Sequence, residues 1–155
     1  MSSETIVTAL FLISAVIAAG VLINAIFPTI TRTADTFGSA SSEADTRIRT
    51  DFRIVNTFAN NTAVKVWLKN VGSARLHTNE VNMGDIYVGS PTNFERRSLS
   101  GRVVIEDNSN SYWDPGETVT ITVVNIDTLL SGPDVYAAVV LPNGVRRDIE
   151  FTKNS

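Results

Sequence analysis

Six residues between Glu106 and Glu117 have the spacing of an oxygen-ligand calcium loop. They fall at positions 1, 3, 5, 7, 9 and 12 of a twelve-residue stretch, in which position 7 supplies a backbone carbonyl: Glu106, Asn108, Asn110, Tyr112, Asp114 and Glu117. Position 1 normally carries Asp, and position 6, which favours Gly, is Ser111. The alternative is an ordinary polar connection, in which Asp114-Pro115-Gly116 turns the chain and Trp113 closes a sandwich edge. We therefore commit to no metal here.

Other catalytic chemistry has few residues to draw on. The chain contains one histidine, His77, and no cysteine. These counts exclude disulfides, thiolate catalysis, cysteine-ligated zinc and histidine metal clusters. A Ser-His-Asp triad would lack the Gly-x-Ser-x-Gly elbow, and no glycine-rich phosphate loop is present. We interpret His77 as a surface or turn residue and expect no enzyme activity, no cofactor and no small-molecule substrate.

Size and charge narrow the class of protein further. The chain has 155 residues, a net charge of −3 and a pI near 5.1. Such a field does not attract phosphate backbones, so nucleic acid is not an expected partner. About 110 residues follow the N-terminal apolar segment and its stalk, which is enough for one domain with one core.

The N-terminal segment has the length and composition of a membrane span. Ile6 to Phe27 is 22 residues without a charge, and as a helix it would extend about 33 Å, which matches a bilayer core. A cleaved signal sequence would carry Lys or Arg where Glu4 stands. A retained transmembrane anchor contacting lipid is therefore the prediction for residues 1–28.

A band of small residues lies within this predicted span. Its members would let a second helix approach closely, although small residues are also simply tolerated in lipid: Ser14, Ala15, Ala18, Ala19 and Gly20. Pro28 then predicts that the helix either kinks or stops and restarts. Residues 29–46 have interrupted helical spacing and are predicted to form a partly helical stalk.

Residues 47–155 alternate apolar and polar side chains with period two between turn signals. The pattern is typical of strands with one buried face and occurs about seven times: around Ile48 to Ile54, Val64 to Leu68, Asp85 to Val88, Leu99 to Ile105, Val119 to Val123, Asp134 to Leu141 and Val145 to Thr152. Asn60-Asn61 marks a first hairpin, and Asn143-Gly144 favours a type I′ turn in a second. The predicted fold class is all-β, an immunoglobulin-like β-sandwich behind a single helix.

Contact surfaces are expected at aromatic side chains and at sheet edges. Trp67, Trp113 and Tyr136 are the interface candidates, because aromatics often dominate interface energetics, and edge strands can extend a sheet into a partner. Some apolar side chains face outward, which is typical either of a contact surface or of a strand covered on both faces. Asn60-Asn61-Thr62 is a glycosylation sequon. Asn60 is its glycosylation candidate, and the sequon favours an extracytoplasmic location for the domain. The Arg residues after the apolar segment favour the opposite orientation.

Several stretches resemble the archaeal archaellum proteins FlaG and FlaF, and FlaG more closely. They are the N-terminal SSETIVTALFLISAVIAAGVLINAIFP with its stalk, EADTRIRTDFRIVN, VKVWLKNVGSARL, SYWDPGETVTI and the Pro-Asn-Gly hairpin, which together span nearly the whole chain. The resemblance implies a type IV pilin-like helix in the archaeal cytoplasmic membrane and a β-sandwich in the pseudo-periplasm of the cell envelope. It also implies a non-catalytic stator role in motility, in contact with FlaF, the surface layer, the archaellum motor or filament, or further copies.

The start of the sequence departs from archaellins and pilins. Their precursors carry a basic residue and glycine before the apolar helix, and Met1-Ser2-Ser3-Glu4 has neither. An uncleaved stator subunit is therefore the first expectation. A pilin-like filament subunit assembled through its N-terminal helix is the alternative, and a calcium-dependent envelope adhesion module comes third.

Overall fold

The computed structural model describes residues 2–106 and 110–154, and the chain divides after Glu43 into two compact units. Helix α1, Ser2–Arg49, begins in the first unit and ends in the second. It contains one apolar stretch with a mean hydropathy of 2.8, so its length and composition suffice to cross a membrane. None of its residues is buried.

The helix continues through Pro28, so of the two predicted alternatives the stop and restart does not occur, and the predicted stalk, residues 29–46, is helical throughout. Hydroxyl side chains bond back to carbonyls of the preceding turn on both sides of the proline. Thr31 Oγ1, for example, donates to the Pro28 carbonyl at 3.0 Å, and Thr33 Oγ1 to the Thr29 carbonyl at 2.7 Å. Such bonds give each hydroxyl an acceptor on its own helix, so these side chains need no hydrogen-bond partner outside it. The helix also includes Ile48, which is 83% exposed and does not begin the first strand as predicted.

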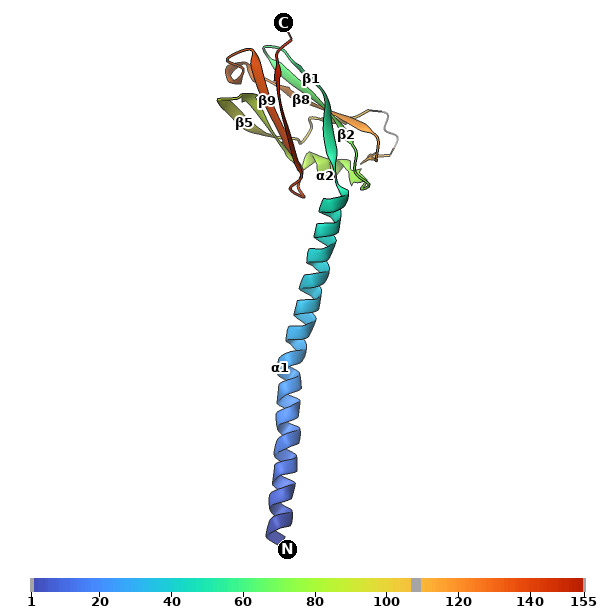
Figure 1. The fold of residues 1–155 in the computed structure, drawn as a ribbon, viewed down its shortest axis with the longest axis vertical. Helices are drawn as coiled ribbons and strands as arrows, with labels where there is room; N and C mark the ends of the chain where they lie inside the picture. Colours follow the sequence, from blue (N-terminus) through green and yellow to red (C-terminus); the bar gives the residue numbers. More distant parts are fainter. Residues whose placement is uncertain (1, 107–109, 155) are drawn as a thin grey trace. The chain divides into compact units, whose positions relative to one another are not determined.

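The second unit is a β domain built from two four-stranded sheets and a two-stranded ribbon (Figure 1). The first, here the β2 sheet, has the order β1-β2-β8-β6, and the second, the β9 sheet, has the order β10-β9-β4-β5. All their pairings are antiparallel. The strands of the β2 sheet are β1 (Phe52–Ala59), β2 (Ala63–Asn70), β8 (Thr118–Val124) and β6 (Val103–Ile105). Those of the β9 sheet are β10 (Arg146–Thr152), β9 (Asp134–Val140), β4 (Asp85–Ser90) and β5 (Asn93–Ser98).

The core lies between the two sheets and follows the period-two pattern. Alternate residues of the central strands are fully buried, among them Val64, Val66 and Leu68 on β2, Val119, Ile121 and Val123 on β8, and Val135, Ala137 and Val139 on β9. Along one side the sheets are joined where β1 approaches β10, through the Asp51–Arg147 ion pair at 2.6 Å and a bond from the Asn154 amide to the Ala59 carbonyl. Both predicted hairpins, β1–β2 and β9–β10, are confirmed.

The structure adds elements to the predicted seven strands. The ribbon pairs β3 (Leu76–His77) with β7 (Tyr112–Trp113), and each has only two residues, too few to show an alternation. Strand β5 reads Asn-Phe-Glu-Arg-Arg-Ser and lies at a sheet edge, where no buried face imposes a pattern. A short helix, α2 (Thr78–Asn82), and a 3-10 turn, η1 (Asp127–Leu129), lie between the strands.

The β9–β10 turn differs from the predicted type I′. Only Gly144 has a positive φ, of 80°, and its amide donates to the Leu141 carbonyl at 2.9 Å. Pro142 and Asn143 therefore occupy the centre of the turn, with proline at the position that its fixed φ favours and glycine at the fourth position. The proline selects this turn over the type I′ turn that an isolated Asn-Gly pair would favour.

Candidate interaction surfaces

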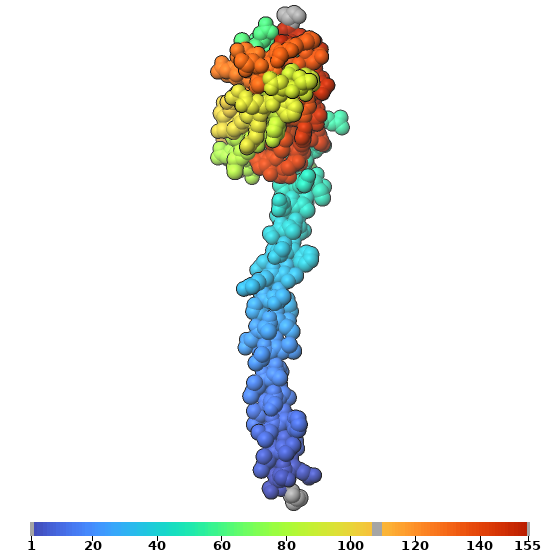
Figure 2. Space-filling model, turned by 90° about the vertical axis from the view of Figure 1, so that its left-hand side faces the viewer, coloured from blue at the N-terminus to red at the C-terminus, as the bar shows by residue number. Residues whose placement is uncertain are grey.

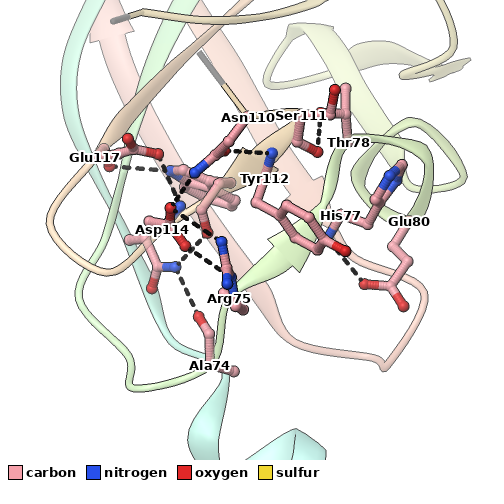
Figure 3. A network of polar contacts seen from close by, with 12 residues as sticks. Ala74, Arg75, His77, Thr78, Glu80, Asn110, Ser111, Tyr112, Asp114 and Glu117 are labelled. Atoms are coloured by element: carbon pink, nitrogen blue, oxygen red, sulfur yellow. Dashed lines mark hydrogen bonds and ion pairs between the residues drawn. The ribbon is translucent and has the colours of Figure 1, made fainter. Parts of the chain in front are cut away.

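The β3–β7 ribbon and helix α2 form a polar network at one end of the β domain (Figure 3). His77 caps α2: its Nδ1 accepts from the Asn79 amide at 3.1 Å, and the Glu80 carboxylate accepts from the His77 amide at 3.2 Å. The imidazole also meets the Tyr112 ring edge to face at 5.0 Å. The guanidinium of Arg75 lies 4.3 Å from the centre of the same tyrosine ring. His77 thus holds a helix end in place.

Asn70 connects this network to the core. Its side chain is 2% exposed, and its amide nitrogen donates to the carbonyls of Ala74 at 2.9 Å and Trp113 at 3.1 Å. Its side-chain oxygen accepts from the Gly72 amide at 3.0 Å. Because Trp113 follows Asn70 by 43 residues, this one side chain joins two loops that are distant in sequence.

Trp113 itself lies in the core. Its side chain is fully buried, packs near Phe52 with ring centres 6.1 Å apart, and donates from Nε1 to the Glu117 carbonyl at 2.9 Å. A side chain without exposed surface cannot contact a partner in the folded domain, so its selection as an interface residue was wrong. The alternative interpretation, that it closes the sandwich edge, is the one its burial supports.

The carboxylates of the predicted calcium loop face protein donors instead of a common centre. Asp114 pairs with Arg75 at 3.0 Å and accepts from Asn110 Nδ2 at 2.8 Å, and Glu117 accepts from the Asp114 amide at 2.8 Å. Glu106 points away from them, toward the Trp67 indole and the Thr120 hydroxyl. Asn108 lies outside the described residues. In the part of the chain that is described, no three acidic or histidine side chains could share a metal.

An apolar groove of about 300 Å³ lies beside α2 and the β9–β10 turn. Among the residues described it has one ionisable group in its lining, Glu80, which already caps α2; the others are Thr46, Leu76, Val81, Met83, Leu141, Pro142 and Asn143. A general acid–base pair needs two such groups in reach of one another. The groove therefore offers no catalytic constellation.

The outer side of the β2 sheet carries three cations around a tryptophan, and we call it the basic face: Arg53, Lys65, Trp67 and Lys69. Arg53 is directly opposite Lys69 in the β1–β2 register, and Lys65 and Lys69 flank half-buried Trp67 on β2. Within the described residues none of the three cations has a salt-bridge partner. The Trp67 indole donates to Glu106 Oε1 at 3.2 Å, which fixes its orientation.

The outer side of the β9 sheet carries carboxylates around a tyrosine, and we call it the acidic face: Asp134, Tyr136, Asp148 and Glu150. Glu150 is opposite Tyr136 in the β9–β10 register. The Tyr136 ring packs against Phe94 of β5 at 5.1 Å, and its hydroxyl accepts from Arg146 at 2.6 Å. Figure 2 shows this side of the β domain, with β5 in yellow beside β9 and β10 in orange to red.

Charges pair on the β4–β5 side of the same sheet. Arg96 lies 3.0 Å from Asp85, and the hydrogen bond and charge of that carboxylate raise the pKa of Arg96 above its ordinary value. On β10, at the opposite edge of that sheet, Arg146 lies 3.9 Å from Asp148. Asp134 and Glu150 have no salt-bridge partner among the described residues.

The remaining predicted residues are exposed. The small-residue band lies along α1, and a Cβ at Gly20 would meet no atom within 4 Å, so its packing role stays a prediction. Asn60 lies in the β1–β2 turn, where its side-chain oxygen accepts from the Thr62 and Ala63 amides at 2.9 and 2.8 Å. Glycosylation of this exposed asparagine also stays a prediction.

Sequence reasoning missed Asn70 and the two charged faces. Asn70 lies just beyond the strand predicted from Val64 to Leu68 and carries no signal that its side chain turns inward. The alternating pattern identified these cations as outward-facing residues of their strands. Their positions relative to one another depend on the strand register, which the pattern does not give. Lys65 and Lys69 could be placed on one face from sequence, whereas Arg53 could not be placed opposite Lys69.

Similarity to known proteins covers nearly the whole chain. A protein of Archaeoglobus fulgidus, described as uncharacterized, is 34% identical over 161 aligned positions, which include 98% of this chain and 99% of that protein. Among solved structures, the archaellum periplasmic stator protein FlaG from Sulfolobus acidocaldarius has a TM-score of 0.51 and 20% identity, over 66% of this chain and 99% of that one. The archaeal flagellum of Methanospirillum hungatei has a TM-score of 0.55 and 13% identity, over 91% of both chains.

Both likenesses establish a shared fold for the antiparallel β domain, and the one to the Methanospirillum hungatei flagellum, over 91% of this chain, also includes much of the apolar helix. Membership rests on sequence, because the family model for archaeal-type flagellin matches residues 2–151. The chain belongs to the archaeal-type flagellin family.

Proposed function

We propose that this protein is a non-catalytic structural subunit of the archaellum, with a stator role like that of FlaG. The observation that carries the proposal is the β domain, whose likeness to the Sulfolobus acidocaldarius stator protein extends over 99% of that chain. A static bracing subunit needs a folded contact domain and an anchor. It needs no site for turnover.

In this proposal α1 anchors the protein in the cytoplasmic membrane. The apolar side chains of its first half are well exposed, among them Phe11 at 72% and Val16 at 72%, and lipid would cover them. The β domain then lies in the cell envelope outside that membrane. Its partners are proteins, and the FlaF and FlaG stator proteins of Sulfolobus acidocaldarius, solved as a complex, are the precedent for a FlaF-like partner.

A filament subunit is the second candidate. It is favoured by the likeness to the Methanospirillum hungatei flagellum, which extends over 91% of both chains and so includes much of the helix as well as the β domain. In a filament, the exposed apolar surface of α1 and its band of small residues would pack against the helices of neighbouring subunits.

The two roles predict different locations in the cell. A tagged chain is followed through shearing of filaments from cells, then through separation of membranes from cytosol. The stator role predicts recovery with membranes, and a gene deletion that abolishes swimming while filaments remain. Abundant recovery in sheared filaments would overturn the stator role and support the filament role.

Orientation is tested on the same cells. Protease added outside cells whose surface layer has been removed should degrade the β domain and leave α1 in the membrane. A β domain that is protected in intact cells and digested only after lysis contradicts an extracytoplasmic location. Recovery of the whole chain in the cytosol would refute both archaellum roles.

A further inference from the structure

The basic face holds like charges close together in a way that costs stability. Arg53 and Lys69 are directly opposite on neighbouring strands, where like charges repel across a Cβ separation of about 5 Å. Lys65 and Lys69 are four residues apart on one strand, about 13 Å, with Trp67 between them. Glu106, the acidic side chain that contacts Trp67, accepts from the indole and from Thr120, and forms no salt bridge with these cations among the described residues.

The acidic face offers the complementary pattern. Asp134 on β9 and Glu150 on β10 are diagonal neighbours on the outer side of the sheet, and both are exposed. Asp148 adds a third carboxylate; Arg146 lies on the same side, 3.9 Å from Asp148, and donates to the Tyr136 hydroxyl, so this face is acidic in net charge with one cation beside its aromatic centre. At the centre the Tyr136 and Phe94 rings pack together, as Trp67 lies at the centre of the basic face. An aromatic centre with a charged surround is the general anatomy of a protein interface.

We propose that the basic face of one copy of this chain docks on the acidic face of a second copy. Trp67 would then lie near the Tyr136–Phe94 pair, and Lys65, Lys69 and Arg53 would lie near the carboxylates of β9 and β10. The contact brings opposite charges together and relieves the repulsion within each face.

Charge complementarity favours a second copy as the occupant. The chain has a net charge of −3, so the rest of the molecule, apart from these three cations, has a net charge of −6. A second copy therefore carries a net negative charge outside its own basic face, and Asp134, Asp148 and Glu150 gather part of it on one side of the β9 sheet. The exposed apolar side chains beside the cations, Val104 at 63% and Phe58 at 36%, suit a protein surface better than a hydrated anionic polymer.

The two faces belong to different sheets, so the contact is heterologous. Each copy would use its basic face for one neighbour and its acidic face for the other, and copies would form a row or a closed ring rather than a two-fold dimer. The inference adds this geometry to the proposed role as an assembly subunit. It requires only that copies meet, so it can be tested without motility.

The test is energy transfer between full-length chains in detergent micelles. The chain has no cysteine, so Ser131→Cys, on an exposed connection before β9, gives one labelling site for donor and acceptor dyes. Lys65→Glu with Lys69→Glu reverses the basic face, and Asp134→Lys with Glu150→Lys reverses the acidic face. All four side chains are exposed, and circular dichroism melting checks that each variant folds. Asp127→Lys, also exposed, is the control for an altered charge elsewhere.

Each reversed variant alone should associate at least about tenfold more weakly than the unaltered chain, and raising the salt concentration to 1 M should weaken the unaltered chain similarly. Mixing the two reversed variants should restore association, because an unaltered basic face then meets an unaltered acidic face. Asp127→Lys should change little.

Three results would overturn the inference. The first is association unaffected by either reversal, as helix-driven contact would give. The second is loss of association with the basic reversal alone, which would indicate another acidic surface of the chain. The third is no recovery in the mixture. Binding of the unaltered chain to vesicles of anionic lipid, lost with the basic reversal while chain association stays intact, would assign the basic face to a membrane instead. Loss of the stator role in cells would leave the result of this test unchanged.

Discussion

Asn70→Asp tests whether the buried side-chain amide of Asn70 holds together the two chain segments that contain Ala74 and Trp113. The substitution keeps the size of the side chain and replaces its NH₂ group with oxygen. Two donor contacts, to the carbonyls of Ala74 at 2.9 Å and Trp113 at 3.1 Å, become contacts between acceptors. At neutral pH the new carboxylate also carries a charge at a position that is 2% exposed.

The expected cost follows from these contacts. Each buried carbonyl left without its donor costs about 1–3 kcal/mol, and a buried charge without a cation adds to this. We expect the free energy of unfolding at pH 7 to fall by about 3–5 kcal/mol. For a domain of this size that corresponds to a fall in Tm of at least about 10 °C.

Acidification should recover part of the loss. The two carbonyls favour the protonated form, so the folded-state pKa of the introduced carboxyl lies above its unfolded value of about 3.9. For an acid whose pKa is raised by folding, stability falls as the pH rises from the unfolded pKa toward the folded one, by about 1.4 kcal/mol per unit. The deficit relative to the unaltered chain is therefore smallest near pH 4 and largest at pH 7.

The assay is thermal melting of the full-length chain, followed by circular dichroism between pH 4 and pH 7.5. Asn93→Asp is the matched control, because Asn93 is exposed on edge strand β5 and undergoes the same chemical change. The reasoning is refuted if both variants lower Tm by the same amount at pH 7, or if the deficit of Asn70→Asp does not shrink on acidification.

Three further predictions concern the same domain and use the same melting assay. Gly89→Ala should lower the free energy of unfolding by about 1–3 kcal/mol, because a Cβ would collide with the Asn93 carbonyl oxygen and lie 2.6 Å from Phe94 Cα. Gly132→Ala is the control and should be tolerated, because a Cβ there would meet no atom within 4 Å. Equal effects of the two substitutions would contradict this. Arg75→Ala should cost under about 1 kcal/mol, and less at high salt, since the side chains of its ion pair with Asp114 are 57% and 29% exposed. A fall in Tm above about 5 °C that persists in 1 M salt would contradict this. Calcium at millimolar concentration should leave Tm within about 1 °C of the value in chelator, because Asp114 and Glu117 already accept protein hydrogen bonds. A rise in Tm that chelator reverses would show that the loop from Glu106 to Glu117 binds calcium.

Local pattern in the sequence determined the main elements. The uncharged run from Ile6 to Phe27 predicts a helix of membrane-spanning length, and the structure has α1 there. Period-two alternation placed Val64, Val66 and Leu68 on a buried face, and they are fully buried. Such predictions succeed because periodicity and turn residues act within a few neighbouring positions.

The tertiary structure decided which of these elements meet. Leu76 pairs with Trp113 across a ladder of two residues, and Asn70 bonds to the same Trp113 43 residues away. Alternation shows that Lys65 and Lys69 share a face, but only the β1–β2 register sets Arg53 opposite Lys69. A side-chain pattern specifies which face is buried and carries no information on its partner strand, so the core position of Trp113 and the two charged faces are settled only when the sheets assemble.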